Sequence, residues 1–161
     1  MGRICTPLII APLIFVVLVS CGGQMNQMDT SDATPVIRTD FSDEETWKKI
    51  QADVAATHGP GSSANVHFIE TRQYDGLTAE ELLQRVPDPN NYGCIFVADA
   101  MAMVSAEHHL LVLDPINPTR ETFRVIPSEV WAVESNLSLA NMDYSEFADS
   151  VDPDGVFRGF K

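Results

Sequence analysis

Short apolar runs recur along the chain after residue 35 and are separated by polar, turn-forming residues. Runs of this length, rich in β-branched and aromatic residues, predict β-strands. The five runs are residues 36–40, 65–70, 94–99, 110–114 and 122–126. The run 94–99 is apolar enough that we expect both of its faces to be buried. The last two runs are separated by the turn 115–120 and predict an antiparallel pair of strands.

Four segments between and after these runs carry helix start signals. Their first residues are Ser42, Thr78, Ser128 and Asp143. After Ser42, Thr78 and Asp143, a glutamate lies three residues further on, as in a capping box. Strands that alternate with helices, followed by a hairpin and two helices, predict one layered α/β domain. We expect a mixed sheet of about five strands with four helices, and the strand order stays open.

The first twenty residues follow a different pattern. Arg3 precedes the uncharged apolar run 8–19. This run is shorter than the roughly 20 residues that span a bilayer, and it suits the apolar region of a signal peptide. The segment Leu-Val-Ser-Cys at 18–21 resembles the bacterial lipobox, in which the cysteine is acylated. We therefore predict cleavage before Cys21 and lipidation of its thiol, for example with palmitate.

The predicted organisation has three parts. Residues 1–20 are a lipoprotein signal peptide, residues 21–34 are a polar flexible tether, and residues 35–161 are an acidic α/β domain. The two or three acyl chains of a mature lipoprotein would hold the domain on the extracytoplasmic side of the cell membrane or outer membrane. The alternatives are an ordinary secretory signal with a chance cysteine, or a short buried strand.

Charge and cysteine content restrict the partners of this domain. The full chain carries a formal charge of -13, and removal of the signal leaves nine bases against 23 acids. Such a domain is expected to repel nucleic acid and anionic lipid headgroups. No Lys or Arg lies between Arg124 and Arg158, so we expect any protein partner to present a basic face; the alternative is a solvated acidic surface. Once Cys5 is removed and Cys21 is acylated, Cys94 has no intramolecular disulfide partner.

Three of the predicted strands end in a carboxylate, at Asp40, Asp99 and Asp114. If these strands are parallel neighbours, the carboxylates share the sheet edge where open α/β folds bind ligands. Their oxygens suit a hard cation such as Mg²⁺ or Ca²⁺. The alternative is that Asp follows strands because it forms turns and caps helices. A hairpin after residue 114 favours this alternative, because it would place Asp114 away from the other two.

The densest cluster of polar and aromatic residues in the sequence is a candidate binding surface. It consists of Trp131, Glu134, Asn136, Asn141 and Asp143. On a helix, Trp131 and Glu134 share a face, which differs from the face of the apolar residues. In the alternative interpretation Trp131 is half buried and the asparagines end and start helices.

Four segments resemble a known family. They are residues 123–144 (FRVIPSEVWAVESNLSLANMDY), 154–160 (DGVFRGF), 38–43 and 96–99. Together they resemble a family of small uncharacterised bacterial proteins, a domain of unknown function, over nearly all of the predicted domain. Members of that family commonly lack a lipoprotein signal. The resemblance implies an intact fold and brings no catalytic residue with it.

Two classes of function follow from the sequence. The first is a non-catalytic, surface-tethered module that binds another protein, and it requires no cofactor. The second is a metal-dependent enzyme that uses the carboxylates at the strand ends. We favour the binding module over the enzyme, because the domain is small and acidic and contains no recognisable catalytic motif.

Overall fold

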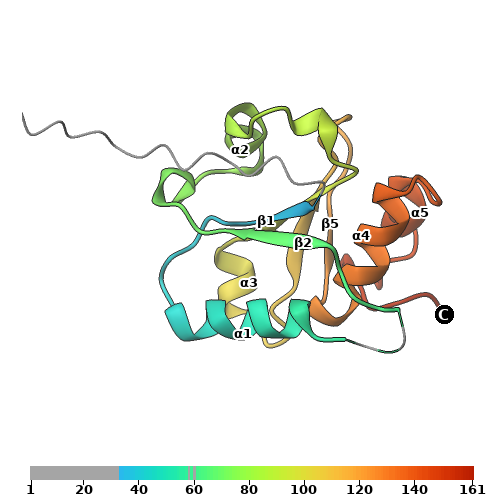
Figure 1. Cartoon of the computed structure of the whole chain (residues 1–161), viewed down its shortest axis with the longest axis horizontal. Helices are drawn as coiled ribbons and strands as arrows, with labels where there is room; N and C mark the ends of the chain where they lie inside the picture. Colours follow the sequence, from blue (N-terminus) through green and yellow to red (C-terminus); the bar gives the residue numbers. More distant parts are fainter. Residues whose placement is uncertain (1–32, 58, 60) are drawn as a thin grey trace, which may run out of the picture.

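The computed structural model describes residues 33–57, 59 and 61–161. In this part of the chain, six strands form one mixed sheet in the order β2-β1-β3-β4-β5-β6, with five α-helices around it (Figure 1). The predicted α/β class is confirmed, with one strand and one helix more than expected. The predicted signal peptide, Cys21 and most of the predicted tether lie outside the described residues.

The strands are β1 (Thr34–Arg38), β2 (Val66–Ile69), β3 (Ile95–Ala98), β4 (Leu110–Leu113), β5 (Phe123–Val125) and β6 (Val156–Phe157). β1 pairs in parallel with both β2 and β3, and β6 pairs in parallel with β5. β4 is antiparallel to β3 and to β5, as the hairpin prediction requires. All strands except β4 therefore run in the same direction.

The helices are α1 (Glu44–Ala55), α2 (Ala79–Arg85), α3 (Ala100–Val104), α4 (Val130–Ser138) and α5 (Tyr144–Ala148). Short 3-10 turns lie at η1 (Arg72–Tyr74), η2 (Pro89–Asn91) and η3 (Pro127–Glu129). The helix predicted to begin with a capping box at Ser42 is instead capped by Asp43, whose side chain accepts hydrogen bonds from the Glu45 and Thr46 N–H groups. α2 and α5 begin with the predicted capping boxes. The helix predicted to begin at Ser128 instead begins at Val130, because Pro127–Glu129 forms a 3-10 turn with no side-chain cap.

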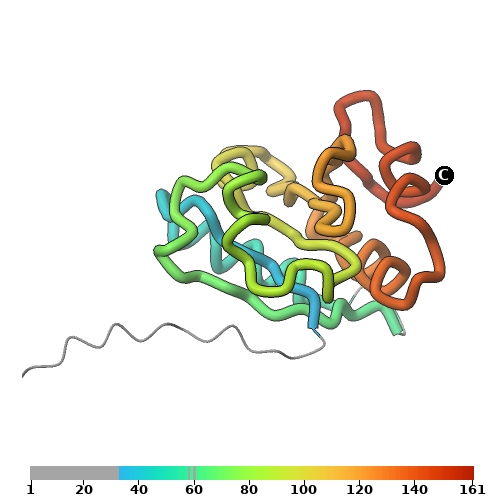
Figure 2. Tube along the Cα trace, turned by 90° about the horizontal axis from the view of Figure 1, so that it is seen from above, coloured from blue at the N-terminus to red at the C-terminus, as the bar shows by residue number. Residues whose placement is uncertain are grey.

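The sheet separates two apolar layers. On one face, α1, α3, α4 and α5 cover a large core that includes Trp47, Phe96 and Phe147. On the other face, α2 and η1 cover a smaller core around Ile37 and Leu82. Residues 130–161, drawn in orange to red, gather at one end of the molecule (Figure 2). None of the helices within the described ranges is long and apolar enough to cross a membrane.

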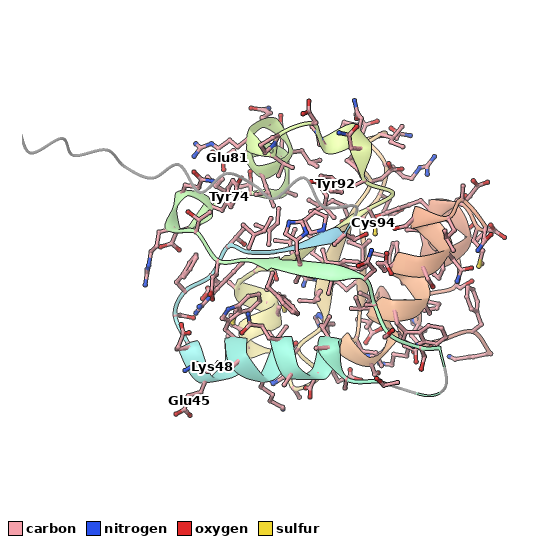
Figure 3. All side chains as sticks on the ribbon, in the orientation of Figure 1. Glu45, Lys48, Tyr74, Glu81, Tyr92 and Cys94 are labelled. Carbon is pink, nitrogen blue, oxygen red and sulfur yellow. The ribbon has the colours of Figure 1, made fainter. Side chains whose placement is uncertain are left out.

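The side-chain view agrees with this layering (Figure 3). Glu45 and Lys48 project from the outer side of α1, away from the sheet. Tyr74 lies on the opposite side of the sheet, in the layer of α2, where it is buried. Cys94 is completely buried just before β3.

Candidate functional site

A groove with a volume of about 600 Å³ opens between α2 and the loop that joins β4 to β5. Its α2 wall carries Glu80, Leu83 and Gln84. Ligand sites in proteins have volumes of roughly 300–1,000 Å³ and are mostly apolar with a few fixed polar groups. We call this feature the α2 groove and treat it as the candidate site.

Local hydrogen bonds fix the loop that forms the opposite wall. Asp114 Oδ1 accepts hydrogen bonds from the backbone N–H groups of Ile116 and Asn117, both at 3.0 Å. Arg120 Nη1 lies 3.0 Å from Asp114 Oδ2, and the guanidinium stands 5.6 Å from the centre of the Tyr144 ring. The loop is therefore held in place by its own residues and by Tyr144, without a ligand.

Three prolines give the α2 groove much of its apolar lining. Pro89 precedes β3, while Pro115 and Pro118 lie in the β4–β5 loop, and Leu113 adds an apolar side chain at the end of β4. Proline has a fixed φ and no backbone N–H. The lining is therefore stiff and offers few backbone donors to a ligand.

The three predicted metal ligands are not brought together. Because β4 runs against β3, Asp114 lies at the sheet edge where the parallel strands begin. Asp40 and Asp99 follow the ends of β1 and β3, at the opposite edge. Among the residues that the structure describes, no group of three His, Cys, Asp or Glu side chains could hold a metal ion.

Both carboxylates at the opposite edge have local partners. Asp40 Oδ1 accepts from the backbone N–H of Ser42 at 2.8 Å and from the hydroxyl of the same residue. Asp99 caps α3 by accepting from Ala102 N–H at 3.0 Å. It also forms a two-point ion pair with Arg124, at 2.5 and 3.1 Å. These contacts follow the turn-and-cap alternative for the strand-end aspartates.

Glu134, a predicted binding residue, is buried and has only 4% of its surface exposed. Its carboxylate accepts hydrogen bonds from the Thr34 hydroxyl at 3.3 Å, the Asn65 backbone N–H at 3.0 Å and the Ser138 hydroxyl at 3.0 Å. It therefore ties α4 to the start of β1 and to the segment before β2.

The other predicted binding residues also have structural contacts. Trp131 is half-buried, and Asn136 Nδ2 donates to the Ala132 carbonyl at 2.8 Å. The Asn141 backbone N–H donates to the Asn136 carbonyl, and Asp143 begins the capping box of α5. None of the five residues of the predicted cluster lines the α2 groove.

The acidic segment between Arg124 and Arg158 is partly neutralised by the basic residues that follow it. Arg158 forms ion pairs with Glu107 at 2.5 Å, Asp152 at 3.0 Å and Asp154 at 2.8 Å. Its guanidinium lowers the pKa of Asp154 to about 2, and Lys161 also pairs with Asp152. Two of the acids that the sequence leaves without a countercharge thus acquire one in the fold.

Sequence reasoning missed the α2 groove, because its walls come from residues 79–89 and 113–122, which are separate segments of the chain. The available signals were the capping box at Thr78 and the proline-rich turn 115–118. The first was interpreted only as a helix start and the second only as a turn. Their juxtaposition depends on the order of the strands, which the sequence left open.

Comparison with known proteins gives one family match. A family model described as a domain of unknown function (DUF6924) matches residues 33–160. The match covers nearly all of the described part of the chain. A search of curated proteins found no match.

Proposed function

This chain belongs to the DUF6924 family of domains of unknown function, whose description states no activity, and we therefore propose its function from the geometry. We propose a membrane-anchored, non-catalytic module that binds a segment of another protein in the α2 groove. The observation that carries the proposal is the preformed groove itself, with its stiff apolar walls and a few fixed polar groups.

The position of the groove supports binding over catalysis. Open α/β sheets usually carry their reactive ligands outside the carboxyl ends of the parallel strands. At that edge, Asp40 forms a turn and Asp99 caps a helix and pairs with Arg124. The α2 groove lies at the other edge, and its one buried carboxylate, Asp114, is already compensated by Arg120. This arrangement suits recognition by shape and charge.

The proposed anchor rests on the sequence before the domain. The apolar run 8–19 and the lipobox-like segment 18–21 together favour acylation of Cys21. A buried methylene contributes about 0.8 kcal/mol, so two or three acyl chains suffice for lasting attachment. The domain would then search for its partner along a membrane surface.

Site-specific photo-crosslinking in the anchored, full-length protein tests the binding proposal. A photoreactive amino acid replaces Gln84, an exposed residue of the groove wall. The matched control places it at Lys48, which is exposed on the outer side of α1 on the other face of the sheet. We expect a discrete adduct from position 84 and none from position 48 in native membranes. Equal adducts from both positions, or none from position 84, would contradict a binding role for the groove.

Metabolic labelling with a fatty acid tests the anchor. The Cys21→Ala variant is expected to lose the label and to accumulate as an uncleaved or soluble form. The control Cys5→Ala removes a cysteine that lies within the predicted signal peptide and should keep the label. Label retained in Cys21→Ala would contradict the proposed attachment.

A further inference from the structure

We propose that the occupant of the α2 groove is a short extended segment that carries apolar side chains and a Lys or Arg, and that its cation pairs with Glu80. This inference rests on the proposed function and specifies the chemistry of the partner. It follows from the charge, the lining and the size of the groove.

Glu80 is the uncompensated charge of the groove lining. Asp114 is paired with Arg120, which leaves Glu80 without an opposite charge among the lining residues. The Glu80 side chain is exposed, and no hydrogen bond or ion pair joins it to the described part of the chain. Its neighbour Glu81 differs, because it closes the capping box with Thr78. Glu80 is therefore available to a cation at the rim.

The groove lining favours contacts with the side chains of a bound peptide over contacts with its backbone. Leu83 and Leu113 offer apolar surface, and the prolines at 89, 115 and 118 offer apolar rings without N–H donors. A peptide that added itself as a sheet strand would need a row of free backbone donors and acceptors. Apolar side chains pressed between these walls need none, so burial of apolar surface supplies the main attraction.

The size of the groove favours an extended segment. A volume of about 600 Å³ corresponds to roughly one turn of an α-helix that is 10–12 Å wide with its side chains, and a single turn is not stable on its own. A few extended residues can fill the same volume and place alternate side chains on the floor and at the rim. The net charge of -13 on the whole chain adds a long-range attraction for a basic segment.

Peptide binding to the full-length protein in detergent tests the inference. The probe is the fluorescent peptide Gly-Leu-Lys-Leu-Lys-Leu-Gly with blocked ends. Two further peptides replace either both Lys by Glu or all three Leu by Ser. We expect measurable binding of the Leu-Lys peptide by fluorescence anisotropy, and much weaker binding of the other two. Equal affinities for all three peptides would overturn the inference.

Two pairs of matched variants locate the bound peptide. Glu80→Gln should weaken the Leu-Lys peptide about two- to fivefold, as expected for an exposed ion pair. Glu45→Gln removes the same charge from the first turn of α1 and should leave the affinity unchanged. Gln84→Trp should fill the groove and reduce affinity at least tenfold, whereas Lys48→Trp should not.

The outcomes separate this inference from the proposed function. If position 84 crosslinks to a partner while Glu80→Gln leaves peptide affinity unchanged, the groove is a binding site and the cation assignment is wrong. If position 84 gives no adduct, the proposed function fails first. Melting temperatures of the four variants within a few degrees of the wild type establish that lost affinity reflects the groove.

Discussion

Replacement of Glu134 by leucine should destabilise the domain strongly, because a buried acceptor shared by three donors is lost. The Thr34 and Ser138 hydroxyls lie 3.1 Å apart and can still pair with each other. The Asn65 backbone N–H keeps no such substitute. Hydrogen bonds to a charged group contribute about 1.5–3 kcal/mol each. Because Asn65 is itself exposed and its bond to Glu134 is only partly buried, water can replace part of that contribution. Since leucine returns some apolar burial, we expect a net loss of about 3 kcal/mol.

Glu134→Gln is the informative companion, because it keeps the shape of the side chain. Its amide oxygen can accept from Asn65, and its NH₂ can donate to hydroxyl oxygens that rotate to receive it. We therefore expect a loss of only about 1 kcal/mol. Glu121→Leu is the control: Glu121 is exposed in the β4–β5 loop, and its replacement should change stability by less than about 0.5 kcal/mol.

Thermal unfolding followed by circular dichroism measures these differences. For a domain of this size, 1 kcal/mol corresponds to roughly 3–5 °C in melting temperature, so Glu134→Leu should melt about 10–15 °C below the wild type. Peptide affinity at the α2 groove should survive below the melting temperature. If Glu134→Leu and Glu121→Leu melted at the same temperature, the structural role assigned to Glu134 would be refuted. A loss of peptide affinity in folded Glu134→Gln would restore it as a binding residue.

Three further predictions concern other contacts. Gly93→Ala should cost about 1–3 kcal/mol in the same melting assay, because its Cβ would lie 2.7 Å from the backbone of Leu137; an unchanged melting temperature would contradict this. Burial raises the pKa of the Cys94 thiol well above its ordinary value, so native protein should resist iodoacetamide at mildly alkaline pH and react only when unfolded. Arg158 lowers the pKa of Asp154 to about 2, so the ion pair stabilises the fold above the ordinary value of 3.8 and is lost as pH falls through about 2. In Arg158→Gln, NMR titration of Asp154 should give a pKa nearer 3.8, and an unmoved pKa would count against this pairing.

The elements that sequence reasoning found are those with local signals. All five predicted strands are present, because each carries its own apolar run, and the capping boxes at Thr78 and Asp143 are confirmed. α3 was missed because its five residues are too few to show helical periodicity. β6 has two residues and forms through its pairing with β5, which lies 30 residues earlier. Such an element has no signal of its own.

The predicted sites failed where they depended on long-range geometry. The proposed grouping of Asp40, Asp99 and Asp114 required parallel strands, and the antiparallel direction of β4 separates Asp114 from the others. Glu134 has the sequence signature of a surface acid on a helix. Its burial depends on Thr34 and Asn65, which lie 100 and 69 residues away along the chain. A local sequence pattern around Glu134 cannot indicate contacts with residues so far away along the chain.

The strand register places the groove close to the point where the chain enters the domain. Val36 lies beside Phe96, which lies beside Val112, so the row that begins at Thr34 continues to Asp114, two strand spacings or about 10 Å away. With Cys21 as the anchor, the twelve residues before Ala33 form a tether whose extended length is at most about 45 Å. With the groove about 10 Å from the end of this tether, it could reach at most about 55 Å from the bilayer surface. Such a tether would confine capture to juxtamembrane segments and raise their effective concentration without any additional contact.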